Sequence, residues 1–568
     1  MAFFLKKSNL KKGLYLQIYE SFYDPIKKET AHRSHKAIGY VDTLIASGTP
    51  DPVSFYKDVV DKMNDEVKLR KQPEKQISES PEKNLGYFLI KSVLDGLKVS
   101  RFFDFFQLKR EFRFRISDVI EALVYSRMVE PCSKNKTINE VIPSLFNKYD
   151  FSYNQLLDGI EYIGNDYEKV IEIFNHQLNL KYPSDSSLTY FDGTNFYFEI
   201  DKEDDIRRKG PSKEHRKDPI LGMGLLLDKN QIPLGMKLYP GNQSEMPVIR
   251  EVIADLKNRN NITGRTIQVA DKGLNGTKNI LDARKNGDGY IFSKSVKRLP
   301  AIEKTWLLLS DGYKDIYNEK ELVYKRKECV DKFPYTYEDE NGKKMTVMLT
   351  EKRVAVFSPK LAKKKKIEIT RMVEKAMTLK ASKAKKDEYG ECSKYVSFVS
   401  ADQKGNKTNG KVIVLLNDAA IQEDLKIAGY NLFVTSEINM SAEDIYGTYR
   451  NLWRIEESFK VMKSYLDVRP VFLQKENAIY GHFLICYICV FLLRVLQFHV
   501  LKNKYSTENI LSFIENFRVV EFASGKYINL ASSSEFIKNI SKDLSLPLTN
   551  YYFNQSQINK VLSHRIMP

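Results

Sequence analysis

Apolar and polar residues alternate over residues 13–40, in GLYLQIYESFYD and then HRSHKAIGYV, with a proline-containing turn between the two runs. Alternation with a period of two is typical of strands, so this stretch predicts a small β-hairpin unit. Residues 66–84 are polar and contain proline, which predicts a linker. From Leu85 to about Lys181 the apolar residues recur at helical spacing, and this pattern predicts several short helices.

The pattern changes again after residue 184. LTYFDGTNFYFEI (188–200) is rich in aromatic residues and threonine, which predicts a strand. Residues 219–241 hold two apolar runs around a polar turn, and residues 246–260 have helical spacing. RTIQVADKG (265–273) predicts a short buried strand, followed by a helix and another strand. The order strand, hairpin, helix, strand, helix, strand predicts an α/β layer architecture.

Residues 295 to about 440 interrupt this architecture with short alternating runs around a lysine-rich helical stretch at 360–386. We expect an inserted, largely β subdomain, whose basic helix either follows nucleic-acid phosphates or is simply solvated. Beyond another apolar strand, residues 483–493 form an uncharged run between His482 and Arg494. Eleven apolar residues are too few to cross a bilayer, which needs about 20, so this run predicts a buried core helix.

The charge balance indicates a polyanionic partner. Lysine and arginine exceed aspartate and glutamate by 90 − 73 = 17, and each phosphate that a cation neutralises releases condensed counterions. The alternative is a basic protein that merely lies near acidic surfaces. Within the predicted helical region, four basic residues suggest DNA binding, although a plain helical scaffold fits equally well: Lys109, Arg110, Arg113 and Arg115.

The five cysteines are scattered, which argues for a reducing compartment rather than a disulfide framework. Cys486 and Cys489 form a C-x-x-C pair inside an apolar helix, but a structural zinc site needs four ligands and no second pair lies nearby. The N-terminus, MAFFLKKSNLKKGLYLQ, lacks the order of a signal peptide. We therefore expect a cytoplasmic protein without a membrane partner.

Two aspartates occupy unusual positions in the predicted strands. Asp192 lies in the middle of an aromatic strand, where an ionised carboxylate is costly unless it is paired or bound to a metal. Asp271 ends another strand. If the two strands are neighbours, both carboxylates meet at one point and can bind Mg²⁺ through oxygen. Taken singly, each is better explained as a hydrogen-bonded structural aspartate.

A third acid stands in TYRNLWRIEESFKVMKSYLDVRP (448–470). Seven residues nearly complete two helical turns, so one face of a helix here combines aromatic, acidic and basic residues. Glu456 lies on that face, whereas Arg454 and Glu457 lie off it. The alternative is an amphipathic core helix with an ion pair between Glu456 and Lys460. The residues of the face are Tyr449, Leu452, Trp453, Glu456, Phe459, Lys460 and Lys463.

Together, YFDGTN, VADKG and Y-x-x-L-W-R-I-E-E-S-F-K-x-x-K resemble bacterial insertion-sequence transposases of the DDE type, and GNQSE (241–245) also fits. The last segment is similar to the Tyr-x2-Arg-x3-Glu-x6-Lys signature of one large group. The resemblance implies an RNase H-like core in which Asp192, Asp271 and Glu456 are the catalytic metal ligands. It implies two Mg²⁺ ions, for which Mn²⁺ would substitute.

The same resemblance places Tyr449 and Lys463 near the DNA end in the active site. Leu452 stands where the signature has arginine, and Arg450 or Arg454 would have to supply the missing cation. Lys460 is a further candidate DNA contact, and Trp453 either stacks a splayed base or packs in the core.

We therefore expect a DDE transposase that binds the terminal inverted repeats of its element, cleaves double-stranded DNA and joins the ends to target DNA, as a homodimer in the synaptic complex. The alternatives are another metal-dependent RNase H-like endonuclease and a catalytically inactive DNA-binding relative. The expected organisation is a β-containing unit (1–65), a linker (66–84), a helical DNA-binding region (85–183), the first part of the core (184–295), a β-rich insertion (296–430), the second part of the core (431–500) and a C-terminal helical region (501–568).

Overall fold

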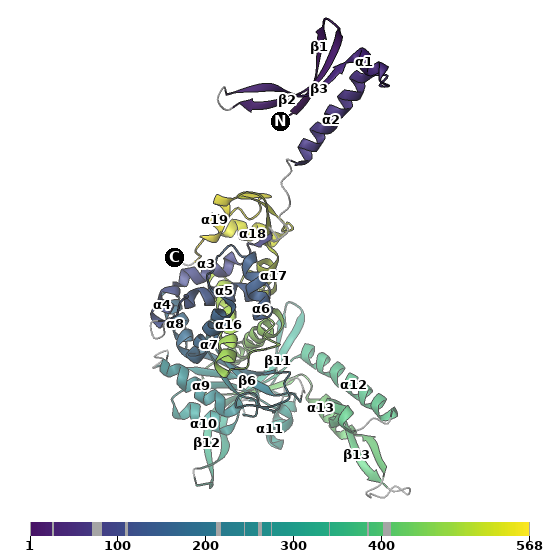
Figure 1. Cartoon of the computed structure of the whole chain (residues 1–568). Coiled ribbons are helices and arrows are strands. Elements are labelled where there is room, and N and C mark those ends of the chain that lie inside the picture. The colour runs from purple at the N-terminus through teal and green to yellow at the C-terminus, as the bar shows by residue number, and fades with distance from the viewer. Residues whose placement is uncertain are drawn as a thin grey trace. The chain divides into compact units, whose positions relative to one another are not determined.

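The structure is a computed structural model, and it describes residues 2–24, 28–70, 82–107, 112–211, 217–243, 245–259, 264–273, 275–339, 341–382, 386–401 and 411–566. The chain separates into two compact units, Met1–Ser80 and Pro81–Pro568. Figure 1 shows the smaller unit in purple and the larger one in the remaining colours.

The smaller unit is a three-stranded antiparallel sheet with two helices (Figure 1). The hairpin predicted for 13–40 is confirmed, because β2 and β3 pair along their length. The first strand was not predicted, since AFFL is a continuous apolar run without alternation. Its elements, in chain order, are β1 (Ala2–Leu10), β2 (Gly13–Asp24), β3 (Glu29–Tyr40), α1 (Val41–Ala46) and α2 (Pro52–Arg70).

The predicted linker is shorter than the sequence suggested. Its first five residues, 66–70, complete α2, and its last three form β4 (Glu82–Asn84). Residues 71–81 lie outside the described residues. The polar composition misled here because α2 is a surface helix, in which half of the described side chains are exposed, and because β4 is held by long-range pairing with residues near the C-terminus.

The helices predicted between Leu85 and Lys181 are confirmed, and they surround α16 (Glu476–Arg494) (Figure 1). Residues Glu476–Val500 are long and apolar enough to cross a membrane by composition, but α16 is buried among these helices as the predicted core helix. Arg113 and Arg115 are described, whereas Lys109 and Arg110 lie outside the described residues. The surrounding helices are α3 (Phe88–Leu97), α4 (Ser100–Gln107), α5 (Ile116–Val129), α6 (Lys134–Lys136), α7 (Tyr153–Asn165) and α8 (Tyr167–Asn179).

A nine-stranded mixed sheet lies at the centre of the larger unit, so the predicted α/β class is confirmed. Its order is β10-β11-β12-β15-β9-β8-β5-β6-β7; β5, β8 and β9 are parallel, and the other pairs are antiparallel. The predicted order of elements between 184 and 295 is also found. These elements are β5 (Leu188–Tyr197), β6 (Ile220–Asp228), β7 (Pro233–Pro240), α9 (Glu245–Arg259), β8 (Ile267–Ala270), α10 (Thr277–Lys285) and β9 (Gly289–Lys294).

Both faces of this sheet are covered, which explains the nearly continuous apolar runs of its strands. On β5, Tyr190 belongs to the core shared with α16, whereas Phe191 belongs to the core formed with α9 and α10. Successive side chains of a strand point to opposite faces, so each strand contributes to both cores. The two strands that position the candidate carboxylates, β5 and β8, are thereby packed on both faces.

The predicted insertion, 296–430, is only partly separate from the core. β10 (Lys314–Asn318), β11 (Glu321–Glu338) and β12 (Lys344–Phe357) extend the central sheet, because β12 pairs with β15 (Tyr430–Thr435), which pairs with β9. The sequence period identified these strands but could not show their partners. The remaining elements are η3 (Val296–Arg298), α11 (Ala301–Leu308), α12 (Pro359–Ala381), η4 (Lys386–Tyr395), β13 (Val396–Ala401), β14 (Lys411–Leu416) and α13 (Asp418–Ile427).

α12, η4, β13, β14 and α13 form an arm that projects from the core (Figure 1). α12 is the lysine-rich helix predicted from the sequence, although residues 383–385 of that stretch lie outside the described residues. In the arm, β13 and β14 pair only with each other among the described strands.

The C-terminal region is not wholly helical, which corrects the expectation for 501–568. Three strands in it complete a four-stranded sheet with β4, in the order β18-β17-β16-β4. These strands have three to six residues, too few for a clear alternating pattern. The elements are α17 (Thr507–Asn516), β16 (Arg518–Ala523), β17 (Lys526–Asn529), α18 (Glu535–Asp543), β18 (Tyr552–Asn554) and α19 (Gln555–Leu562).

Candidate active site

Asp192 and Asp271 lie side by side at the carboxyl end of β8. The parallel strands β5 and β8 pair from Leu188 opposite Ile267 to Phe191 opposite Ala270, so the next residue of each chain is one of the two aspartates. Neighbouring strands lie about 4.8 Å apart. β8 ends at Ala270, whereas β5 continues to Tyr197, and both carboxylates are half-buried. The two strands are neighbours, as the sequence argument required.

Glu456 lies on α15 (Trp453–Lys460), which packs against β5. The single helix expected over this stretch is divided: α14 (Ala442–Arg450) ends before Asn451 and Leu452, and α15 begins after them. The predicted face divides as well. Leu452 and Phe459 are buried, whereas Glu456 and Lys460 are exposed, and Trp453 keeps 46% of its surface exposed and is therefore not core packing.

Tyr449, at the end of α14, lies within electrostatic range of all three carboxylates. Its hydroxyl group is 3.1 Å from Ser293 Oγ of β9, and its ring packs against Phe433 at 4.5 Å between centroids. Burial raises the pKa of Tyr449, and the hydrogen bond with Ser293 opposes that rise. The carboxylates of Asp271, Glu456 and Asp192, in that order, raise the pKa further. All three acids therefore lie within electrostatic reach of one phenol.

The donor chemistry of this group fits a hard divalent cation, because all three side chains offer carboxylate oxygens. Among the residues that the structure describes, however, no three His, Cys, Asp or Glu side chains lie close enough together to form a metal-binding group. Each aspartate accepts a hydrogen bond from the next backbone N–H group: Gly193 N–H donates to Asp192 Oδ1 at 2.8 Å, and Lys272 N–H donates to Asp271 Oδ1. The three carboxylates thus lie within electrostatic range of Tyr449, but in the described residues they are too far apart to share one metal ion.

The basic candidates lie in different surroundings. Lys463 Nζ is 5.3 Å from the ring centroid of Phe196, which belongs to the same strand as Asp192. Lys460 lies over Tyr465 at 5.8 Å, and Arg450 lies over Tyr446 at 5.8 Å. Lys463 thus lies beside the strand that carries Asp192.

The chain matches the family model of the transposase DDE domain over residues 183–492. The chain belongs to this family. It is also 33% identical over 84 residues to a probable transposase for insertion sequence element IS5377 from Geobacillus stearothermophilus. That match covers 15% of this chain and spans 22% of the length of the relative.

Among solved structures, the chain is similar to piggyBac transposase in a cryo-EM structure of a synaptic complex with hairpin DNA. The two chains are 10% identical, the match covers 76% of this chain and 78% of the other, and the TM-score is 0.31. That score is too low for residues of the two proteins to be compared.

Leu452 departs from the signature of this transposase group, and the structure gives the departure a physical setting. Its side chain is 5% exposed and belongs to the core around α16. Arg454 points elsewhere: its guanidinium stacks on Trp453 at 3.9 Å, lies over Phe498 at 5.1 Å and forms an ion pair with Glu457 at 3.1 Å. The position of the signature arginine is thus an apolar contact here.

Arg494 is a residue whose role the sequence reasoning missed. It is fully buried at the end of α16, where its guanidinium is 3.3 Å from a carboxylate oxygen of Glu457 and donates to Ser458 Oγ at 3.2 Å. It ties α16 to the helix that carries Glu456. An arginine that ends an apolar helix was a signal for a buried acidic partner, but the sequence could not show which acid supplied it.

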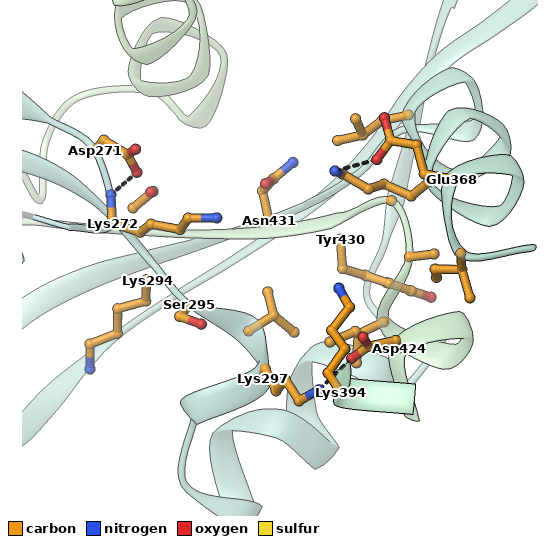
Figure 2. Close-up of a pocket in the computed structure, with 18 of the residues that line it drawn as sticks. Asp271, Lys272, Lys294, Ser295, Lys297, Glu368, Lys394, Asp424, Tyr430 and Asn431 are labelled. Atoms are coloured by element: carbon orange, nitrogen blue, oxygen red, sulfur yellow. Dashed lines mark hydrogen bonds and ion pairs between the residues drawn. The ribbon is translucent and has the colours of Figure 1, made fainter. Parts of the chain in front are cut away.

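A cavity of about 500 Å³ opens beside Asp271 and Tyr449, between the core and the arm. Figure 2 shows Asp271 and Lys272 on one side of it and Glu368, Asp424 and Lys394 on the other. Two of its lysines form ion pairs with acids of the arm side: Lys365 with Glu368 at 2.7 Å and Lys297 with Asp424 at 2.8 Å. The lysines that line the cavity are Lys272, Lys294, Lys297, Lys365 and Lys394.

Proposed function

We propose that this chain is the DDE transposase of an insertion sequence, which binds the terminal inverted repeats, cleaves the DNA strands there and joins the ends to target DNA. The observation that carries this proposal is the arrangement of Asp192, Asp271 and Glu456 around Tyr449. Membership of the transposase DDE domain family supports it. The proposed RNase H-like core consists of β5 to β9 with α15 packed against β5.

Asp192, Asp271 and Glu456 are the residues that would hold divalent cations, proposed as two Mg²⁺ ions with Mn²⁺ as a substitute. When bound, such cations activate a water or a DNA 3′-hydroxyl group and stabilise the oxygen that leaves. The register of β5 and β8 sets the positions of Asp192 and Asp271 relative to each other, whereas Glu456 lies on a separate helix, α15. Tyr449 is held by Ser293 and Phe433, so its hydroxyl group would be kept in place beside a phosphate bound at these carboxylates.

The cations around this group would position double-stranded DNA. Lys463 lies beside the strand that carries Asp192, and the other proposed contacts, Arg450, Trp453, Arg454 and Lys460, lie on α14 and α15. Phosphate contacts of this kind fix the register of a duplex without reading its sequence. The synaptic complex would contain two copies of the chain, because two element ends must be held together, and the proposed location is the bacterial cytoplasm.

The test uses the full chain with a DNA fragment that carries the gene and its flanking sequence. We expect Asp192→Asn, Asp271→Asn and Glu456→Gln each to lower Mg²⁺-dependent cleavage at the element ends by at least ~100-fold, since each removes a charged ligand while keeping the shape. Binding of the same DNA, measured by gel shift, should remain close to that of the unmodified protein.

Glu508→Gln is the matched control, because Glu508 is an exposed carboxylate on α17. This variant should cleave the DNA as the unmodified chain does. A variant of the triad that cleaves normally would remove that residue from the site. Cleavage that persists in EDTA would contradict the metal requirement. Cleavage away from the element ends would instead favour a different endonuclease, and DNA binding without any cleavage would favour an inactive relative.

A further inference from the structure

The sheet of the N-terminal unit has one covered face and one open face. On the central strand β2, Leu16, Ile18 and Glu20 are buried. Side chains alternate along a strand, so Gln17 and Tyr19 point to the opposite face, where they are half-buried. α1 contacts β2 and β3, and α2 contacts β1, so the helices of this unit account for the covered face.

The register of the three strands shows which side chains share the open face. Tyr19 pairs with Phe4 of β1 and with Ser34 of β3, and Ser21 pairs with His32. Lys6 Nζ lies 4.4 Å from the ring centroid of Tyr19, and Ser21 Oγ is 3.2 Å from His32 Nδ1. The face therefore combines a cation with aromatic rings and neutral hydrogen-bonding groups.

The acidic side chains of the described strands lie on the other side of the sheet. Glu20 is on the covered side, where it forms an ion pair with Arg33 at 2.9 Å. Asp24 and Glu29 are opposite each other in the register of β2 and β3. Because side chains alternate along β2, both lie on the same side of the sheet as Glu20. The other acids are on α1, α2 and the segment between them. Two exposed lysines, Lys11 and Lys12, form the β1–β2 turn at one end of the sheet.

We propose that this open face binds the major groove of duplex DNA. Three strands span about 10 Å between their outer backbones, and the major groove is about 12 Å wide and admits strands as well as helices. Lys6 and Lys12 would contact phosphates. Gln17, Tyr19 and His32 would face base edges, whose pattern of donors and acceptors suits such groups. The proposal rests on the proposed function, because the ligand is the same DNA.

The test compares two pairs of substitutions in the full chain. Lys6→Ala with Lys12→Ala, the open-face pair, removes one cation from the open face and one from the β1–β2 turn, whereas Lys57→Ala with Lys62→Ala removes two exposed cations from α2. The probes are duplexes of about 40 base pairs, roughly four helical turns, tiled through the DNA on both sides of the gene. Affinity is measured by fluorescence anisotropy over a range of salt concentrations.

We expect the open-face pair to weaken binding of the best probe by about tenfold or more and to reduce the salt slope by about 2, since each lost phosphate contact lowers it by about 1. The α2 pair should bind within about twofold of the unmodified chain. Gln17→Ala should reduce the preference for that probe over a shuffled duplex without changing the salt slope. Equal melting temperatures exclude misfolding as the cause.

An equal loss in both lysine pairs would overturn the proposal, because it would show only a general effect of charge. Unchanged affinity of the open-face pair would also overturn it. In either case DNA binding by the unmodified chain and cleavage at the element ends still stand. If the unmodified chain binds none of the duplexes and cleaves none, the proposed function itself has failed.

Discussion

The ion pair between Glu457 and Arg494 allows a specific prediction about how α15 is held. Arg494 is 0% exposed, and its guanidinium also donates to Gln497 Oε1 at 2.7 Å and to Thr507 Oγ1 at 3.1 Å. Burial lowers the pKa of Arg494 to about 10, and Glu457 opposes that fall, so the guanidinium is charged at neutral pH. Glu457 is the acid that compensates this buried charge.

The separation of 3.3 Å between Arg494 Nη2 and Glu457 Oε2 sets the scale. At an effective dielectric constant of about 20, Coulomb's law gives about 5 kcal/mol of attraction, which desolvation partly offsets. Glu457→Gln removes the compensating charge and leaves the guanidinium buried, so it should cost about 3–5 kcal/mol. Glu457→Gln combined with Arg494→Met removes both charges and should cost less than Glu457→Gln alone.

Differential scanning calorimetry of the full chain at pH 7.5 measures this difference. Glu457→Gln should lower the melting temperature of the larger unit by about 3–5 °C, and the double variant should recover at least half of the loss. DNA cleavage should fall in the same order, because Glu456 is the neighbouring residue on α15. Melting of Glu457→Gln at the temperature of the unmodified chain would refute the reasoning. So would a double variant whose loss in melting temperature equals the sum of the losses of Glu457→Gln and of Arg494→Met measured singly.

The pH dependence follows from the same contact. Burial raises the pKa of Glu457, but the charge of Arg494, the hydrogen bond from Thr507 and the contact with Arg454 together hold it below 4.5, its ordinary value. A carboxyl group whose pKa is lowered by folding stabilises the protein above the unfolded value, and this stability is lost as pH falls through the folded value. The difference in melting temperature between Glu457→Gln and the unmodified chain should therefore shrink below about pH 4.5.

Burial raises the pKa of Asp228 to about 7, so folding opposes its ionisation; Asp228→Asn should become more stable relative to the unmodified chain as pH rises from 4 to 8, measured by thermal melting. Leu452→Arg should destabilise the larger unit by a few kcal/mol, because it places a charge at a buried apolar position, and a gain in end-joining would contradict this. Lys463→Ala should weaken DNA binding and reduce its salt slope by about 1, whereas Lys538→Ala, an exposed lysine on α18, should not.

The candidate site was largely predictable because its parts are local patterns. Asp192 and Asp271 stand out against apolar strands, and the order of elements from 184 to 295 follows from periods of two and of 3.6 residues. The helical face predicted to contain Glu456 contains both buried and exposed residues in the structure. A break of two residues at Asn451 and Leu452, together with packing on one side, separates buried from exposed positions that a single helical wheel had grouped.

Pairing between distant strands was not predictable in the same way. The strands of residues 314–357 have a clear period, but whether they form their own sheet or extend another depends on contacts with Tyr430–Thr435. Backbone groups on a strand edge pair with any strand of suitable geometry, so the side-chain pattern does not choose the partner. The lysine-lined cavity beside Asp271 exists only because these strands bring the arm to the core.

The sequence by itself therefore determined the α/β class, the two strand aspartates, the acidic helix and the basic balance, since each is written in the spacing or type of neighbouring residues. The tertiary structure alone decided that Asp192 and Asp271 follow the last paired residues of two neighbouring strands, that Tyr449 lies within electrostatic range of all three carboxylates, and that Arg494 compensates Glu457. Most of these relations join residues tens to hundreds of positions apart. Electrostatic energy depends on distance and burial, and neither is defined until the chain has folded.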